Sequence, residues 1–185
     1  DFGVSGAVIR GIDVGTAHEV LNLSEYVDSE DLERLPGEGE ELPGIIMGEE
    51  LARNMGVIEG DEVLMLSPEG AVSPLGLVPR TMRFRVVKRF NSGLYEFDAT
   101  SAFIALERAQ EFFNMGDAVT GVEVKVEDIY RVDRITDVLK ERLPAGFIIK
   151  DWQEMNQNLF AALKLEKLAM FIILVMIVFV AAFNI

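Results

Sequence analysis

Few side chains in this sequence could take part in acid–base, nucleophilic or metal chemistry, and their spacing does not match that of a known catalytic or metal-binding motif. His18, the only histidine, stands beside Glu19 in a polar stretch, and a lone exposed imidazole is seldom a catalytic base. Ser67 and Ser73 have no accompanying His and acid of the kind that activates a nucleophile. Cysteine is absent, which excludes thiol catalysis, disulfides and thiolate metal sites. We therefore expect a non-catalytic protein.

The acidic residues favour neither a phosphate site nor a calcium site. The stretch "PGEGEELPG", residues 36–44, carries carboxylates where a phosphate loop needs N–H groups and a lysine, and it lacks the ligand spacing of a calcium loop. With 17 Lys and Arg against 31 Asp and Glu, the net charge of −14 argues against nucleic acid as a partner. We expect no metal and no cofactor.

The stretch "VSPLGLVPR", residues 72–80, is the least ordinary segment of the chain. Its two prolines, Pro74 and Pro79, fix φ and lack an N–H, so we expect a loop rather than a helix or a central strand. The loop is unusually apolar, because Leu75, Leu77 and Val78 lie between the prolines. Either it folds back onto its own core or it presents an apolar tip to a partner.

An uncharged run closes the sequence, from Leu168 to Ile185. As a helix it would be about 27 Å long, close to the roughly 30 Å of a bilayer core. We interpret it as part of a transmembrane helix; a buried core helix is the alternative. Because the chain starts at Asp1 and stops within this run, we expect it to be a piece of a longer protein.

Between these features the hydrophobic pattern predicts alternating strands and helices, hence an α+β fold with a mixed sheet. Helices are expected in the stretches SEDLERL, EELARNM, LERAQEFFN and VDRITDVLKERL, and a continuous one from Gln153 into the apolar run. Strands are expected in VSGAVIRGIDV, at Ile45–Met47, and in EVLML, MRFRVVKRF, SAFIAL, GVEVKVED and GFIIKDW. Of these, GVEVKVED alternates most clearly, with Val122, Val124 and Val126 on one side.

The stretch "DWQEMNQNLFAALKLEKLAMFIILVMIVFVAAFNI" resembles the stalk and second transmembrane helix of permeases of the LolC/LolE family, which belong to lipoprotein-releasing ABC transporters. "IIMGEELARNMGVIEGDEVLMLSP" and "LYEFDATSAFIALERAQEFF" are similar to the extracytoplasmic domain of the same permeases. The resemblance implies a MacB-like periplasmic domain over 1–151, a stalk helix over 152–167 and the start of a transmembrane helix over 168–185. It also implies that a first transmembrane helix precedes the domain.

For function, the resemblance implies a subunit in the inner membrane of a Gram-negative bacterium with this domain in the periplasm. ATP hydrolysis on a separate LolD-like ATPase subunit would drive lipoprotein extraction, and a LolA-like carrier would receive the lipoprotein. The permease would pair with a second copy or a paralogue; the "YEFD" stretch favours pairing with itself. The carrier would dock on the hook, residues 72–80, through Ser73, Pro74, Leu75, Gly76, Leu77, Val78 and Pro79.

Two further sites follow from the resemblance. Arg80 and Arg83 are candidates for the basic pad beside the hook, while Leu64 and Thr81 depart from the family pattern there. Leu159, Phe160, Leu163 and Met170 are expected to line a cavity for acyl chains, or else to pack against a second permease. The alternative function is a MacB/FtsX-like permease that transmits ATPase strokes for efflux or to a periplasmic hydrolase, which needs no proline-stiffened apolar hook.

Overall fold

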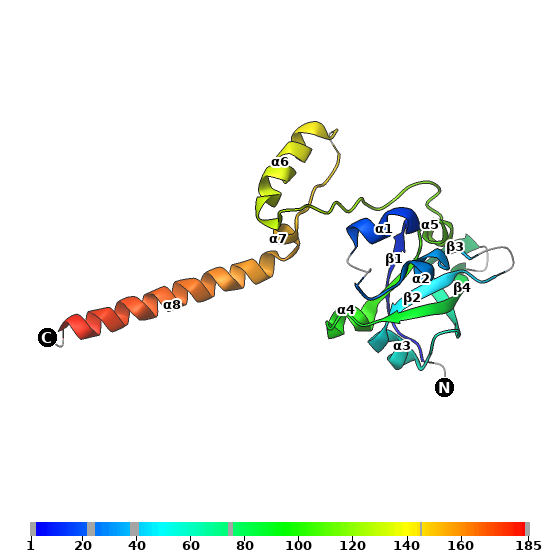
Figure 1. Cartoon of the computed structure of the whole chain (residues 1–185), viewed down its shortest axis with the longest axis horizontal. Coiled ribbons are helices and arrows are strands. Elements are labelled where there is room, and N and C mark those ends of the chain that lie inside the picture. Colours follow the sequence, from blue (N-terminus) through cyan, green and yellow to red (C-terminus); the bar gives the residue numbers. More distant parts are fainter. Residues whose placement is uncertain (1–2, 22–24, 38–40, 74–75, 145, 184–185) are drawn as a thin grey trace. The chain divides into compact units, whose positions relative to one another are not determined.

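The computed structural model of the chain, drawn in Figure 1, describes residues 3–21, 25–37, 41–73, 76–144 and 146–183. The first half comprises β1 (Val8–Ile12), α1 (Val14–Val20), α2 (Ser29–Glu33), β2 (Gly44–Gly48), α3 (Glu49–Met55), β3 (Glu62–Ser73) and β4 (Gly76–Phe90). The second half comprises α4 (Tyr95–Thr100), β5 (Ser101–Ala105), α5 (Leu106–Phe113), the 3₁₀ turn η2 (Ile129–Arg131), α6 (Val132–Arg142), α7 (Trp152–Met155) and α8 (Gln157–Phe183).

The strands form one mixed sheet in the order β1-β5-β2-β4-β3. The pairs β1–β5 and β2–β4 are parallel, while β2–β5 and β3–β4 are antiparallel. A mixed sheet with helices on it confirms the predicted α+β class. β3 and β4 follow one another directly and form an antiparallel hairpin, whereas the parallel partners are separated along the chain, β2 and β4 by α3 and β3, and β1 and β5 by the other three strands and the helices between them.

Both faces of the sheet are covered, so its central strands are buried on both sides. Ile46 and Phe103 point to the face that α1 and α2 cover, together with Leu35 and Phe90. Their neighbours along the strands, Ile45, Met47, Ala102 and Ile104, point to the other face, where they pack with residues of α3 and α5. Alternate burial on two faces explains why β2 and β5 consist almost wholly of small and apolar residues.

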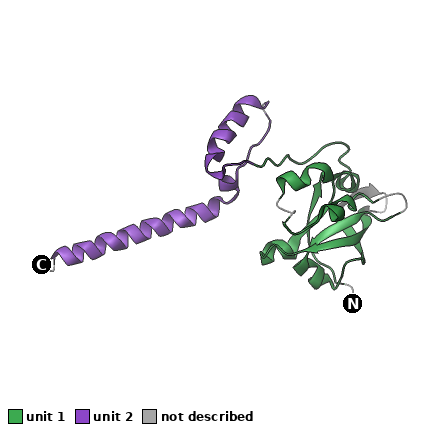
Figure 2. Cartoon of the chain, in the orientation of Figure 1, with its two compact units in different colours: residues 1–125 green, residues 126–185 purple. Residues whose placement is uncertain are grey.

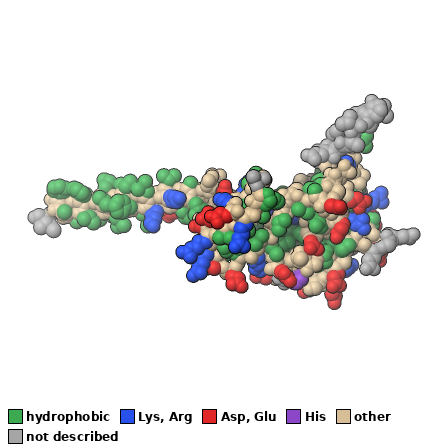
Figure 3. Space-filling view, turned by 90° about the horizontal axis from the view of Figure 1, so that it is seen from above, with side chains coloured by type: hydrophobic (Ala, Val, Ile, Leu, Met, Phe, Trp, Pro, Cys, Tyr) green, Lys and Arg blue, Asp and Glu red, His purple; other side chains and the backbone are tan. Residues whose placement is uncertain are grey.

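The chain divides into two compact units, residues 1–125 and 126–185, which Figure 2 colours separately. The sheet lies in the first unit, and the second consists of η2, α6, α7 and α8. In α8, 27 residues form a helix that is long and apolar enough to cross a membrane. In Figure 3 hydrophobic side chains dominate the surface of α8 toward its C-terminal end, whereas Lys side chains lie nearer its N-terminal end. A break at Asn156 separates α7 from α8.

Two predicted strands are wrong. The segments GVEVKVED and GFIIKDW have no strand structure in the described residues, although their patterns are the ones that predict strands. Val122 is 81% exposed and Ile148 is 84% exposed. A strand needs a hydrogen-bonding neighbour, and neither segment has one in the part of the chain that the structure describes.

Candidate functional site

The hook belongs to the end of the β3–β4 hairpin, and the prediction of a loop over this segment was wrong. The loop expected over residues 72–80 is instead mostly strand: β3 continues to Ser73, β4 starts at Gly76, and these two residues face each other in the ladder. Only residues 74 and 75 separate the strands. Because a hairpin fixes the backbone on both sides of its turn, the apolar residues are carried on a paired ribbon.

This ribbon reaches well past the sheet. The pairing of β4 with β2 begins at Arg85, opposite Gly44, so residues 76–84 pair with β3 alone. Phe84 and Ser67 are still buried, so only the part of the hairpin beyond the Ser67–Arg80 pair extends from the core; at about 3.4 Å per residue, the four steps from Arg80 to Gly76 give an arm of roughly 14 Å. We call residues 67–80 the hook arm. A two-stranded arm of this length exposes backbone and side chains that a partner can contact.

A bulge explains how proline fits into strand β4. Ser67 faces Arg80 and Ala71 faces Val78, so three residues of β3, 68–70, stand opposite Pro79 alone. A proline cannot donate to the ladder, and strands tolerate it at such irregularities or at edges. The premise that a proline excludes a central strand was sound, but Pro79 lies outside the central part of the sheet.

Of the hook residues, Val78 and Pro79 have described side chains, and both are exposed, Val78 by 54%. For Ser73, Gly76 and Leu77 the structure describes the backbone, which belongs to the hairpin ladder. Pro74 and Leu75 lie outside the described residues. An exposed valine next to a proline at the end of an arm is suited to insertion into an apolar recess on another protein.

At the base of the arm, the solvent face of the hairpin is more apolar than the sequence had suggested. Leu64 and Leu66 are more than half exposed, and they face Arg83 and Thr81 across the ladder. These four side chains therefore form one exposed patch, the base patch, with Arg83 as its cation. Leu66 was missed because its neighbours Met65 and Val63 are apolar as well, so the strand lacks the alternation that marks a solvent face.

Arg80 and Arg83, the two pad candidates, lie on opposite faces of β4, because they are three positions apart along a strand. Arg83 is exposed on the base patch. Arg80 is half-buried, and its Nη1 donates a hydrogen bond of 3.3 Å to the backbone oxygen of Phe112 near the end of α5. A guanidinium next to the carbonyls at a helix C-terminus is electrostatically favourable. Arg80 thus fastens the arm to α5, and Arg83 is the one free to meet a partner on the base patch.

The lipid-cavity candidates on α8 divide into two sets. Leu159, Leu163 and Met170 are spaced four and seven residues apart, so they share one helix face, and each is about half exposed. Phe160 is turned from this face and packs edge-on against Trp152, with ring centroids 5.3 Å apart. The shared face can contact lipid, acyl chains or another helix.

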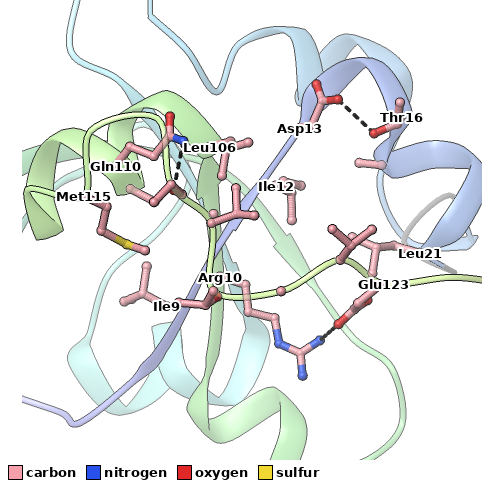
Figure 4. A pocket seen from close by; sticks show the side chains of 18 of the residues that line it. Ile9, Arg10, Ile12, Asp13, Thr16, Leu21, Leu106, Gln110, Met115 and Glu123 are labelled. Carbon is pink, nitrogen blue, oxygen red and sulfur yellow. Dashed lines mark hydrogen bonds and ion pairs between the residues drawn. The ribbon is translucent and has the colours of Figure 1, made fainter. Parts of the chain in front are cut away.

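A pocket of about 630 Å³ lies beside β1, between α1, α5 and residues 115–123 (Figure 4). Its wall is mostly aliphatic, and its polar groups bind one another: Arg10 pairs with Glu123 at 3.6 Å, and Gln110 donates to the Ala118 oxygen at 3.0 Å. His18 lies outside it, exposed, with its Nε2 3.9 Å from a Glu19 oxygen. Among the described residues, no three His, Asp or Glu side chains are grouped so that they could hold one metal ion.

An α+β unit with a projecting hairpin, together with a helix fit to cross a bilayer, defines a membrane protein with an extramembranous domain. Comparison with known proteins narrows this class. No family model matches the chain. It is 33% identical, over 183 residues, to a lipoprotein-releasing system transmembrane protein LolC of Neisseria meningitidis, and 35% identical, over 179 residues, to a LolC of Xylella fastidiosa. A lipoprotein-releasing system transmembrane protein LolE of Haemophilus influenzae is 22% identical over 180 residues.

These matches extend over 98%, 96% and 96% of this chain and over 43%, 42% and 42% of the respective relatives. The chain belongs to the LolC/LolE family of lipoprotein-releasing transmembrane proteins. It spans about two fifths of the length of these relatives.

Proposed function

We propose that this chain is the carrier-docking part of an ABC transporter permease that extracts lipoproteins from the inner membrane. The hook arm would present its tip to a LolA-like periplasmic carrier, which takes over the lipoprotein. The observation that carries the proposal is the hook arm, whose two strands pair with each other and not with β2, and on which Val78 is exposed near the end. The relatives are named as proteins of a lipoprotein-releasing system, and this supports lipoprotein as the cargo class.

The physical case for docking is one of preorganisation. We infer that the hairpin ladder, which includes Ser73 and Gly76, orders the backbone of the arm before a partner binds. The arm then loses less conformational entropy on binding than a free loop would. The carrier needs only an apolar recess for the tip and an acidic or polar rim for Arg83 on the base patch.

The remaining parts of the proposal follow from family membership. We assign ATP hydrolysis to a separate LolD-like subunit, and pairing to a second copy of the permease or a paralogue. The domain would lie in the periplasm of a Gram-negative bacterium, with α8 in the inner membrane. Leu159, Leu163 and Met170 on one face of α8 would line the space for acyl chains, with Phe160 at its edge.

The proposal is tested by measuring the affinity of the full-length permease in nanodiscs for the carrier of the same organism. Leu75→Asp and Val78→Asp each place a charge in the apolar recess, and Pro74→Gly loosens the turn. We expect each aspartate to weaken binding at least tenfold, about 1.4 kcal/mol. Ile58→Asp is the matched control, because Ile58 is 61% exposed, close to the 54% of Val78, and it precedes β3 at the end of the hairpin opposite its tip.

The control should bind within twofold of wild type. If the wild-type permease fails to bind the carrier, or if the hook variants bind as tightly as the control, the docking role is wrong. A permease that transmits ATPase strokes without a carrier would then account for the fold better.

A further inference from the structure

The first strand of the sheet has an unpaired edge. β1 stands at the end of the strand order, and in the described part of the chain it pairs with β5 alone. An edge strand presents N–H and C=O groups that another extended chain can bind. β1 therefore has hydrogen-bonding capacity for one further strand on its free side.

The pocket of about 630 Å³ opens at this edge. Four of the five β1 residues line it, from Ile9 to Ile12. Consecutive residues of a strand point to opposite faces, so a pocket that reaches all four wraps around the edge of the strand. We call this pocket the edge slot.

Residues 115–123 form the outer wall of the edge slot (Figure 4). Among the described residues, the segment 119–123 makes no hydrogen bond between backbone groups. Its contact with β1 is an ion pair of exposed side chains, Arg10 and Glu123, at 3.6 Å. The slot therefore has backbone hydrogen-bonding groups on two sides, those of β1 and those of residues 119–123.

The other two walls of the slot are aliphatic or aromatic. They are formed by α1 on one face of the sheet and by α5 on the other, through Ala17, Val20, Leu21, Leu106, Ala109 and Phe113. In an added strand, successive side chains would point to these two walls in turn. The slot is thus suited to an extended chain whose side chains are uncharged on both sides.

We propose that the edge slot binds an extended peptide of about five residues by strand addition to β1, and that this peptide belongs to the lipoprotein cargo. The length follows from β1, which has five residues. The choice of the cargo rests on the proposed function, whereas the choice of an extended peptide rests on the slot itself.

Other occupants fit the slot less well. An acyl chain would match the two apolar walls, but it would remove the edge groups of β1 from water without giving them a hydrogen-bond partner, which is unfavourable. A second copy of this chain would bring a whole sheet with its helices, and the outer wall at residues 115–123 lies in its way. A single peptide segment avoids both difficulties.

The place of the slot favours the cargo as the source of the peptide. Helix α5 joins the slot to the hook arm, because Phe113 lines the slot and the backbone oxygen of Phe112 accepts the hydrogen bond from Arg80. In the proposed function the lipoprotein is handed over at the hook, so a site that shares α5 with the arm would hold its polypeptide part during the transfer. The net charge of −14 favours a segment that is uncharged or basic.

Photo-crosslinking in living cells tests the occupant. A photoreactive residue replaces Val119, which lines the slot and is 47% exposed, in the full-length permease. The same residue at the exposed Ile58 is the control. We expect an adduct between position 119 and a lipoprotein, and none from position 58. No adduct from position 119, equal adducts from both positions, or an adduct with the carrier or a second permease in place of the lipoprotein would refute the proposal.

A matched pair of variants tests whether the slot itself is responsible. Thr120 lies on the outer wall and is exposed, so its replacement should not disturb the fold. Thr120→Trp fills the slot and should lower the yield of the position-119 adduct at least about tenfold, whereas Thr120→Ser should leave it unchanged. Equal yields from the two variants would refute binding in the slot.

Amide hydrogen exchange of the full-length permease in nanodiscs, with and without a bound lipoprotein, tests the strand addition. The β1 amides that point away from β5 and the amides of residues 119–123 should exchange at least about tenfold more slowly when the lipoprotein is bound. Amides of residues 62–66 in β3, at the opposite edge of the sheet, are the reference and should not change. Unchanged exchange in β1 would refute strand addition even if the adduct forms.

The slot and the hook can fail separately. Thr120→Trp should leave the affinity for the carrier within about twofold of wild type, and Val78→Asp should not weaken the position-119 adduct. If the hook variants leave carrier binding unchanged while the position-119 adduct forms, the docking role of the hook is wrong and the edge slot stands. The opposite pair of results refutes the edge slot and leaves the hook.

Discussion

Replacing Arg80 by methionine should loosen the hook arm, whereas the same change at Arg83 should not. Arg80 donates to the Phe112 oxygen at 3.3 Å, and the contact is half-buried. A hydrogen bond from a charged donor contributes about 1.5–3 kcal/mol when well formed; since this one is long and partly solvated, we assign it about 1 kcal/mol. Methionine keeps an aliphatic stem of similar length, so the loss reports the hydrogen bond rather than the packing.

Thermal unfolding of the chain in detergent measures the effect. For a unit of 125 residues, a loss of about 1 kcal/mol corresponds to a decrease in Tm of roughly 4 °C. Arg83→Met removes an exposed cation with no hydrogen bond to α5, so its Tm should stay within about 1 °C of wild type. Exchange of the backbone amides of residues 71–73, 76–78 and 80 should be faster in Arg80→Met than in Arg83→Met.

Carrier binding should respond in a different way. Arg83 lies on the base patch, so Arg83→Met in the full-length permease should weaken its affinity for the carrier about fivefold, near 1 kcal/mol. The Tm should not decrease. Equal decreases in Tm for both variants, or no decrease for Arg80→Met, would refute the assignment of Arg80 to α5 and Arg83 to the solvent face.

Three further changes test the fold that holds the arm, each by thermal or denaturant unfolding. Gly48→Ala should destabilise the protein by about 1–3 kcal/mol or more, because the new Cβ would lie 2.0 Å from the backbone oxygen of Asp98. An unchanged stability would contradict the close packing of β2 on α4. Asp98→Ala should lower the free energy of unfolding by about 2 kcal/mol, because the buried carboxylate accepts hydrogen bonds from the Ser92 amide and hydroxyl. Asp98→Asn keeps an acceptor oxygen and should lower it less. Arg85→Gln should change stability by less than about 0.5 kcal/mol, because its ion pair with Glu62 is half exposed on both sides, and a larger loss would show that the pair is less solvated than its geometry indicates.

The sequence predicted those elements correctly whose structure depends on residues within a few positions along the chain. The strand at Ile45–Met47 and the end of α3 at Gly56, which has φ of 71°, follow from side chains and backbone preferences within a few residues. The predicted stop of α6 before Pro144 is confirmed for the same reason, since a proline restricts the residue that precedes it.

Features that depend on distant partners were not predictable. Pro79 was taken to exclude a strand because the bulge opposite it is a property of the β3–β4 pairing, which the sequence around Pro79 does not reveal. Arg80 and Arg83 were grouped as one pad because neighbours in sequence are easily mistaken for neighbours on a surface. Conversely, the valines at 122 and 124 have the alternating pattern of a strand, but this segment has no neighbouring strand among the described residues, so the prediction was wrong.

Site-specific photo-crosslinking from position 78 in living cells tests the central claim most directly. A photoreactive residue replaces Val78 in the full-length permease, and the same residue replaces Ile58 as the control. The account predicts a covalent adduct between position 78 and the periplasmic lipoprotein carrier, and none from position 58. No adduct from position 78, or equal adducts from both positions, would contradict a hook that docks the carrier.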